Sequence, residues 1–313
     1  MQKENKENAT MTPLSQTILS QYQVRKSKKQ KTAFIALLQQ HFPELTVQEG
    51  GFPKCRNLII GDIENAKVIL CAHYDTCAQL PFPNFIAPRN PLLSILYSIL
   101  LVIPLVLAVI IINLLLNYIT SDYGLHYWLS LAAYFGLLLL LLVGPANKHT
   151  ANDNTSGVIT LCELLSVLTN EERAKAAFVF FDHEETGLIG SAYFRSKHKK
   201  QMQDKLLINL DCVSDGDHIL VSANKAARKE YGKLLKQVFE ATDSKSILFT
   251  KSEYTYYPSD QLGFKKSVAL AALKKKRFVG YYMDRIHTSK DTVFDKVNIK
   301  LICDSIHRLL KKI

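Results

Sequence analysis

Five short stretches of this sequence carry side chains that could hold a metal ion and move a proton. Each contributes histidine, aspartate or glutamate with almost no cationic partner; the stretches are AHYD at 72–75, ANDNTSG at 151–157, DHEETGLIGS at 182–191, NLD at 209–211 and IHTSKDT at 286–292. Carboxylates gathered at one point repel each other, and their pKa values rise unless cations hold them. Imidazole nitrogen and carboxylate oxygen suit zinc, and a pair of metal ions suits hydrolysis. Together the stretches predict a hydrolytic metal centre.

Each stretch taken alone has an ordinary structural explanation. An aspartate after a strand is commonly a turn former, and an aspartate before a helix, such as Asp153, is commonly an N-cap. The run HEETG at 183–187 is not the zinc-binding pattern His-Glu-x-x-His, because Gly187 stands where the second histidine would be. The prediction of a metal centre therefore rests on the whole set and on no single member.

In their order along the chain, the stretches resemble the motifs of the co-catalytic di-zinc exopeptidases. This family includes bacterial leucyl aminopeptidases and, more distantly, glutamate carboxypeptidases and glutaminyl cyclases. AHYD resembles its His-x-Asp strand end, ANDNTSG its bridging-aspartate motif, and DHEETGLIGS its Glu-Glu-x-Gly-Leu-x-Gly-Ser motif; NLD resembles its third strand end, and IHTSKDT its His-Thr-x-x-Asp-Thr motif. The resemblance covers residues 32–88 and 146–313 and implies a mixed central sheet flanked by helices on both faces.

The resemblance implies two zinc ions held by five ligands. One ion would be bound by a histidine and an aspartate, the other by a glutamate and a histidine, and a further aspartate would bridge both. His73 and Asp211 would bind the first ion, and Glu185 and His287 would bind the second. Asp153 would be the aspartate that bridges both. None of these positions departs from the family's motifs, so the resemblance implies an intact metal centre.

Two further carboxylates would act beside the metal ligands. Glu184 would be the general base, which takes a proton from the attacking water and returns it to the departing amine. Asp75 would orient His73 through the second ring nitrogen of the imidazole, as metal-bound histidines require. Glu185 would point away from Glu184, because successive residues of an extended strand face opposite ways.

One loop departs from the family's pattern. The segment YPSDQLGF at 257–264 resembles a loop near the substrate pocket that usually reads Ser-Asp-His, and here Gln261 takes the third position. The departure leaves open both the role of this loop and the preference for a substrate side chain.

Short apolar runs and longer amphipathic runs alternate around these stretches. Strands are predicted for NLIIGD, KVILCAH, AFVFFD and LLINLD, each rich in Val, Ile, Leu or Phe and ending in a polar residue. Helical periodicity occurs in KTAFIALLQQHF, SGVITLCELLSVL, KEYGKLLKQVFEAT and IKLICDSIHRLLKKI. The alternation indicates an α/β fold whose sheet is covered on both faces, with ligands bound beyond the carboxyl ends of the strands.

Two strongly apolar runs interrupt this alternation, at residues 92–116 and 125–143, and neither contains Asp, Glu, Lys or Arg. Each is near the roughly 20 residues needed to cross about 30 Å of hydrocarbon. Buried helices of a soluble core are the alternative, but such helices seldom run this long without a polar face. The runs therefore predict a transmembrane hairpin inserted between the first ligand motif and Asp153.

The charge around the hairpin predicts its orientation. The connecting segment at 117–124 has no Lys or Arg, whereas Arg89 and Lys148 flank the outer ends and RKSKKQK occupies 25–31. The positive-inside rule then places the catalytic domain of this integral membrane protein in the cytoplasm. The first 20 residues show no signal-peptide pattern.

Net charge indicates which class of partner the protein binds, and the spacing of the cysteines indicates whether they bind metal or form disulfides. The formal net charge is +11, but the lysine-rich runs at 196–200 and 274–277 lack the interleaved aromatic residues of a base-stacking surface. Attraction to anionic lipid explains the charge more simply, so a bilayer is expected as a partner and nucleic acid is not. The six cysteines, among them Cys71 and Cys77, have no zinc-knuckle or redox spacing and are expected to be reduced, buried bystanders.

The chain thus divides into three parts. Residues 1–31 form a basic, loosely ordered arm with a short helix near 12–24; residues 32–88 and 146–313 form the peptidase domain; and residues 89–145 form the inserted hairpin.

The expected function is that of a membrane-tethered, zinc-dependent aminopeptidase acting on small peptides. A glutaminyl cyclase is one alternative, but those relatives use a single zinc, and the presence of both His73 and Asp211 argues against a one-metal site. A non-catalytic receptor or scaffold of the same fold is another alternative, but such proteins lose ligands and none is missing here.

Overall fold

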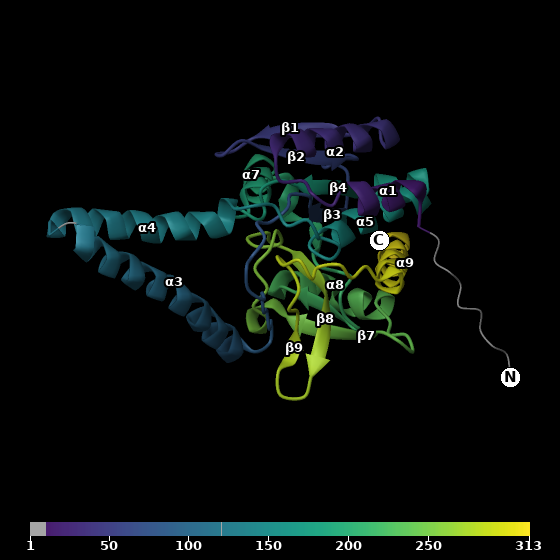
Figure 1. Cartoon of the computed structure of the whole chain (residues 1–313). Helices are drawn as coiled ribbons and strands as arrows, with labels where there is room; N and C mark the ends of the chain where they lie inside the picture. The colour runs from purple at the N-terminus through teal and green to yellow at the C-terminus, as the bar shows by residue number, and fades with distance from the viewer. Residues whose placement is uncertain (1–10, 120) are drawn as a thin grey trace.

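The computed structural model describes residues 11–119 and 121–313, which form one nine-stranded sheet and the helices around it (Figure 1). The strand order is β1-β2-β4-β3-β5-β8-β6-β7, and β9 pairs with β8 alone. The strands are β1 (Thr46–Gly50), β2 (Cys55–Ile60), β3 (Val68–His73), β4 (Ala176–Phe181), β5 (Leu206–Leu210), β6 (His218–Ala223), β7 (Ser246–Lys251), β8 (Ser267–Lys276) and β9 (Gly280–Tyr282).

The sheet is mixed, as the sequence predicts. Strands β4, β3, β5 and β8 are parallel to one another, whereas β1 and β2 pair antiparallel and β6 runs antiparallel to β8. Every residue of β3, β4 and β5 is buried, as expected for parallel strands that are covered on both faces. Side chains alternate between two cores: Val68 and Leu70 pack in one, Ile69 and Cys71 in the other.

Helices cover both faces of the sheet. One core includes side chains from α1, α2, α5, α8 and α9, and the other includes Phe194 of α7. The helices are α1 (Pro13–Gln21), α2 (Lys28–His41), α5 (Thr155–Val167), α6 (Asn170–Ala174), α7 (Ile189–Lys197), α8 (Lys225–Val238) and α9 (Lys296–Lys312), with the 3-10 turns η1 (Gln201–Gln203) and η2 (Ser252–Tyr254).

The order of the central strands creates a switch point at which a ligand-binding site can form. Strand β3 lies between β4 and β5, so the chain crosses from one side of β3 to the other as it passes from β4 through α7 to β5. The carboxyl ends of these three parallel strands meet at one edge. Ligands of open α/β sheets bind at such a switch point.

Two long helices leave the sheet as a pair and project to one side of the molecule (Figure 1). They are α3 (Pro91–Ile119) and α4 (Tyr123–Val143). None of the side chains of α3 is buried, and Ser130 Oγ of α4 donates a hydrogen bond to Asn113 Oδ1 of α3 at 2.6 Å. Both helices are long and apolar enough to cross a membrane. The two expected helices are present, and their membrane insertion stays a prediction.

The N-terminal region differs from the expected loose arm. Residues 11–31 contain α1, and the side chains of Leu14, Ile18 and Arg25 are buried. Thr12 donates its backbone N–H to Glu163 Oε1 at 2.9 Å, which fixes the start of α1 against α5. The amphipathic helix buries its apolar side chains, and Arg25 finds backbone acceptors inside the protein, so the segment is packed. Residues 1–10 lie outside the described part of the chain.

Candidate active site

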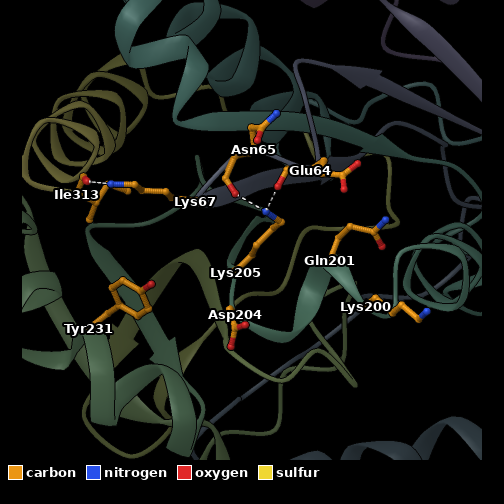
Figure 2. Close-up of a pocket in the computed structure, with 10 residues that line it drawn as sticks. Glu64, Asn65, Lys67, Lys200, Gln201, Asp204, Lys205, Tyr231 and Ile313 are labelled. Carbon is orange, nitrogen blue, oxygen red and sulfur yellow. Dashed lines mark hydrogen bonds between the residues drawn. The ribbon is translucent and has the colours of Figure 1, made fainter.

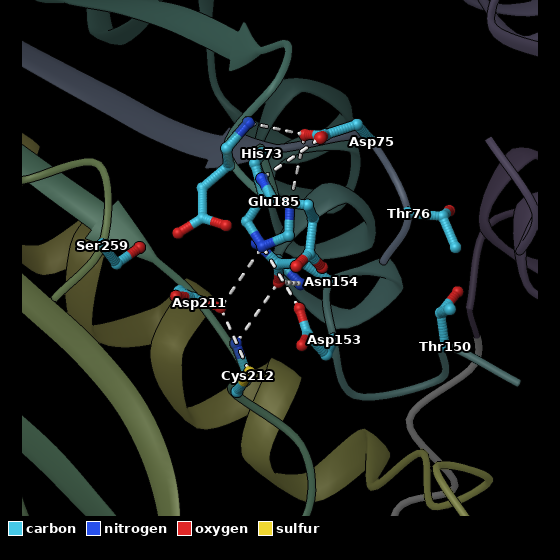
Figure 3. Close-up of polar contacts among 12 residues, drawn as sticks. His73, Asp75, Thr76, Thr150, Asp153, Asn154, Glu185, Asp211, Cys212 and Ser259 are labelled. Carbon is cyan, nitrogen blue, oxygen red and sulfur yellow. Dashed lines mark hydrogen bonds and ion pairs between the residues drawn. The ribbon is translucent and has the colours of Figure 1, made fainter. Parts of the chain in front are cut away.

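The predicted ligands meet at the carboxyl edge of the sheet. His73 is the last residue of β3, Asp211 follows β5, and Glu185 lies four residues beyond the end of β4. Asp153 lies just before α5, and His287 lies in the segment between β9 and α9. Strands buried on both faces thus fix three of the ligands, and a helix start and a loop supply the other two. Figure 3 shows the His73 side of this cluster.

Asp153 lies between two histidine–carboxylate groups. Its Oδ1 is 3.2 Å from His73 Nε2, and its Oδ2 is 2.9 Å from His287 Nε2. His73 Nε2 is also 3.5 Å from Asp211 Oδ1, and His287 Nε2 is 3.2 Å from Glu185 Oε2. The arrangement brings together all five predicted ligands, and it divides them into the same two groups around Asp153.

The ligand atoms of each group lie close enough to hold one ion. Those of Asp153, Glu185 and His287 all lie within 4.8 Å of one another, and the same is true of His73, Glu184 and Asp211. Glu184, predicted as the base, therefore lies on the His73 side of the cluster. Metal binding by these residues stays a prediction.

Two of the cysteines, which the sequence predicts to be bystanders, lie among these groups. Cys77 lies with Asp153, Glu185 and His287, and Cys212 lies with Asp153 and Asp211. Burial raises the pKa of both thiols well above its ordinary value, and neighbouring carboxylates raise it further. A thiol must lose its proton to bind a metal, and these surroundings hold the proton on both thiols as long as no ion is bound. All six cysteines are free and buried.

Asp75 mainly holds the backbone of the presumed base. Its Oδ1 accepts the backbone N–H of Glu184 at 3.0 Å, and its Oδ2 accepts that of Glu185 at 3.2 Å. Its Oδ1 is 3.6 Å from His73 Nδ1, beyond hydrogen-bond distance, and Nδ1 has no hydrogen-bond partner among the described residues. Asp75 thus lies beside the ring nitrogen of His73 that the sequence predicts, while its two hydrogen bonds go to the backbone of Glu184 and Glu185; its role in orienting His73 stays a prediction.

The two adjacent glutamates are separated by a turn and not by strand geometry. His183 has a φ of 58°, and the backbone N–H groups of Gly187 and Leu188 donate to the carbonyl oxygen of Glu184 at 3.0 and 2.9 Å. Strand β4 has already ended at Phe181. The expectation that an extended strand end sends the neighbouring side chains apart was therefore wrong in its reason, although the two carboxylates do join different groups.

Asp291, the aspartate of the IHTSKDT motif, fixes the loop that carries Asp153. Its Oδ1 accepts the backbone N–H of Asn152 at 2.8 Å, and its Oδ2 accepts that of Asp153 at 2.9 Å. Asn154 completes the loop: its side chain caps α5 at Gly157 N and donates to the carbonyl oxygen of Leu210 at 2.9 Å. The peptide bond between Asp153 and Asn154 is cis.

Two buried cations lie behind the strand ends. Arg25 donates through Nε to the carbonyl oxygen of Tyr74 and through Nη1 to Thr155 Oγ1. Lys31 of α2 pairs with Asp182, whose Oδ2 also accepts the backbone N–H of Arg56 at 2.9 Å. Burial lowers the pKa of Arg25 to about 10, against the opposing field of nearby carboxylates. Both cations come from the basic run at 25–31, which the sequence places in a loosely ordered arm.

The electrostatics of the cluster favour a bound cation. Burial raises the pKa of Glu184 well above its ordinary value and that of Glu185 to about 8. Burial alone would lower the pKa of His287, but Glu185 and Asp153 outweigh it and raise that pKa to about 9. Glu185 Oε1 is buried without a hydrogen-bond partner among the described residues. Oxygen and imidazole donors with excess negative charge fit a divalent ion such as zinc.

In the loop at 257–264, Asp260 interacts with the carboxylates of the cluster, whereas Gln261 anchors the loop. Gln261 accepts a hydrogen bond from Asn209 Nδ2 at 2.9 Å and donates to the carbonyl oxygen of Tyr257 at 2.6 Å, so it anchors the loop to β5. Asp260 is fully buried, and neither of its carboxylate oxygens has a hydrogen-bond partner among the described residues. Burial raises its pKa to about 7, and repulsion from Asp75 and Asp211 adds to this.

A large cavity lies elsewhere in the molecule. It has a volume of about 760 Å³, and its lining includes Lys67, which precedes β3, and Lys205, which precedes β5 (Figure 2). These residues lie at the opposite ends of the strands from His73 and Asp211. Lys205 already donates to the carbonyl oxygens of Glu64 and Ala66. The cavity is therefore separate from the cluster.

Comparisons with known proteins identify a family and a fold. The model of peptidase family M28 matches residues 137–308. The structure is similar to those of a Zn-dependent exopeptidase from Parabacteroides distasonis (TM-score 0.57, 13% identity, covering 95% of this chain and 96% of that one) and of a glutaminyl cyclase from Porphyromonas gingivalis (TM-score 0.56, 14% identity, 95% and 96%). It is also similar to the LapA aminopeptidase of Legionella pneumophila (TM-score 0.55, 13% identity, 95% and 67%).

At these identities the likeness shows the fold alone. No curated protein sequence matches the chain.

Proposed function

Because the chain belongs to peptidase family M28, whose model matches residues 137–308, we propose that it is a zinc-dependent aminopeptidase that removes N-terminal residues from small peptides at a membrane surface. The observation that carries the proposal is the position of Asp153, with one carboxylate oxygen next to each of two histidines. That is the arrangement a ligand shared by two ions requires.

The ions would be held by the residues grouped around Asp153. His73 and Asp211 would hold one of them, and Glu185 and His287 the other. Bound zinc would polarise the peptide carbonyl and lower the pKa of a water molecule. The negative charge of the cluster and the unpartnered Glu185 Oε1 support this assignment.

Glu184 would move the proton. It would accept a proton as the oxygen of water bonds to the peptide carbon, and it would give that proton to the amine nitrogen as the C–N bond breaks. Asp75 supports this role because it binds the backbone N–H of Glu184 and so limits where the carboxylate can lie. A base must lie within hydrogen-bond reach of the proton that it takes, and such fixing serves that need.

The membrane part of the proposal is supported by α3 and α4. Their length and apolar composition fit a transmembrane hairpin, and the side chains of α3 are not buried against the rest of the protein. We propose a cytoplasmic catalytic domain from the distribution of Lys and Arg around the two helices.

A glutaminyl cyclase is the second candidate, because the fold is equally similar to that of the Porphyromonas gingivalis enzyme. The two candidates differ in product. An aminopeptidase releases a free amino acid, whereas a cyclase closes an N-terminal glutamine into pyroglutamate and releases ammonia.

The deciding experiment uses full-length protein purified in detergent. Free and N-blocked peptides, including one that begins with glutamine, are incubated with the protein, with and without chelator, and the products are identified by mass spectrometry. Release of single residues from free N-termini, lost with chelator and in Glu184→Gln, is the expected result. Pyroglutamate as the sole product would replace this proposal with the cyclase, and a lack of any metal-dependent product would refute both.

A further inference from the structure

Two loops of the catalytic domain contact the chain just before α3. The backbone N–H of Tyr256 donates to the carbonyl oxygen of Pro88 at 2.8 Å. Asn90 Nδ2 donates to the carbonyl oxygen of Val279, in the turn between β8 and β9, at 3.5 Å. Since α3 begins at Pro91, both loops lie beside the point where the proposed hairpin leaves the domain.

Both loops turn aromatic side chains outward at this point. Tyr254 is 73% exposed, Tyr256 is 65% exposed and Phe278 is 89% exposed. Thr255 and Tyr257, which alternate with the two tyrosines, are buried, so the exposure follows from the backbone direction and is not disorder of the whole loop. We refer to Tyr254, Tyr256 and Phe278 as the aromatic collar.

The surface around the aromatic collar is positively charged. Lys251 lies 5.8 Å from the centre of the Tyr254 ring, and Arg277 lies 5.4 Å from that of Phe278. The acidic side chains of the same loops are already paired, since Glu253 binds Arg228 and Asp284 binds Lys274. The exposed cations of this surface that form no ion pair with any described residue are Arg89, Lys251, Lys275, Lys276 and Arg277.

The length of α3 places this surface at a bilayer. A helix of 29 residues is about 43 Å long, close to the roughly 40–45 Å of a bilayer with its headgroups. If Ile119 lies at one side of the membrane, Pro88 to Asn90 therefore lie in the headgroup region of the other. Tyrosine concentrates at that depth, and lysine and arginine are attracted to anionic lipid there.

We propose that the aromatic collar and its five cations bind the anionic headgroup surface of the bilayer that α3 and α4 cross. The inference rests on the membrane insertion in the proposed function and adds to it a second, non-spanning contact. The occupant is lipid because the patch adjoins the start of an apolar helix and carries positive charge that no described acidic residue pairs.

The contact would also orient the active site. The segment before α3 pairs with the loop that carries His287: the backbone N–H of Leu80 donates to the carbonyl oxygen of His287 at 2.8 Å, and Ile86 forms a bridge with Met283. Asp260 lies four residues beyond Tyr256 and interacts electrostatically with His73, Asp75 and Asp211 of the cluster. A collar bound to the headgroups would hold the active site close to the bilayer. The active site would then preferentially bind peptides whose N-terminus lies at the membrane surface.

Tryptophan fluorescence tests the proposal and its premise separately. Trp128, in α4, is the single tryptophan of the chain and is 66% exposed, so quenching by lipid-borne quenchers reports hairpin insertion. A Trp128→Phe, Phe278→Trp protein reports the collar. A Trp128→Phe, Val167→Trp protein is the control, because Val167 is exposed at the end of α5, which packs against α1 and α9 and carries no part of the collar. All three are reconstituted in nanodiscs of neutral lipid or of neutral lipid mixed with phosphatidylserine.

The expected result is quenching at position 278 that increases with phosphatidylserine and falls in 1 M salt, where the screening length is about 3 Å. Position 167 should show no quenching. Quenching of Trp128 without quenching at 278 overturns the collar and leaves the hairpin intact. Quenching at neither position overturns both. Shielding at 278 that is the same in detergent as in either lipid overturns lipid as the occupant, since it indicates a protein contact.

Charge reversal gives an independent test. The triple variant Lys275→Glu, Lys276→Glu, Arg277→Glu should remove the phosphatidylserine dependence at position 278. The matched control is Lys229→Glu, Lys233→Glu, Lys236→Glu on α8, which packs beside α9. An equal effect of both variants would show that only overall charge matters and would overturn a specific role for the collar.

Discussion

At the residue scale, two carboxylates act by holding backbone. Asp75 binds the N–H groups of Glu184 and Glu185, and Asp291 binds those of Asn152 and Asp153. A carboxylate accepts two such bonds at once, one at each oxygen, which an amide cannot do. These aspartates fix the positions of the residues that we assign to proton transfer and to the metal.

Replacement of the presumed base should remove turnover and spare the metal. Glu184→Gln keeps the size of the side chain but removes its proton acceptor, so kcat should fall by about 10²–10⁴-fold. Zinc content, measured by atomic emission on the same samples, should be unchanged. Glu171→Gln, an exposed change in the first turn of α6, is the control and should keep full activity. Full activity in Glu184→Gln would assign the proton transfer to another group.

Replacement of Asp291 should weaken metal binding without removing a ligand. In Asp291→Asn one backbone N–H of the 152–153 loop would face an amide NH₂, and Asp153 would lose its fixed position. Changes to such supporting residues cost about 10–100-fold in metal affinity. Competition with a fluorescent chelator measures this. Asp304→Asn on the surface of α9 should have no effect, and an unchanged affinity in both variants would contradict the role of Asp291.

At the scale of elements, the strands were predictable and the helix contacts behind them were not. Runs such as KVILCAH are apolar enough to be recognised alone, and their order identifies which ends carry His73 and Asp211. Arg25 and Lys31 were missed because a basic run near the N-terminus is usually solvated. Their partners lie far along the chain: Lys31 pairs with Asp182, 151 residues away, and no local pattern indicates such a contact.

The Lys31–Asp182 pair makes a testable contribution to the packing of α2 on β4. Both side chains are nearly inaccessible, at 6% and 2% exposed, so Lys31→Met would leave a buried carboxylate without its cation. Breaking one partner of a buried pair costs about 3–5 kcal/mol. The thermal midpoint in detergent should therefore fall clearly for Lys31→Met and not for the exposed Lys29→Met in the same helix.

The double variant Lys31→Met, Asp182→Asn separates charge from packing. Because it removes the unpaired charge, it should recover much of the loss in thermal midpoint. A double variant as unstable as Lys31→Met would show that the lysine acts through packing or through other partners.

At the scale of the whole molecule, the metal should join elements that are far apart in sequence. Its predicted ligands come from β3, α5, β4, β5 and the segment before α9, so bound zinc would cross-link most of the domain. An ion at a concentration of about 100 times its Kd adds about 2.7 kcal/mol to the free energy of unfolding. Chelation should lower the thermal midpoint, and added zinc should restore it. A His73→Ala, His287→Ala protein should not respond, and a response as large as that of the wild type would place the ion elsewhere.

The position of α3 and α4 in the chain has a consequence for biosynthesis. His73 is synthesised before both apolar helices and Asp153 after them, yet their side chains lie 3.2 Å apart. In a bilayer, only an even number of crossings returns the chain to the compartment that it left. A nascent chain with only one of the two helices inserted would have the two halves of its metal centre on opposite sides of the membrane. If α3 and α4 insert as we propose, such a chain would be inert, and both helices would have to insert before the protein could be active.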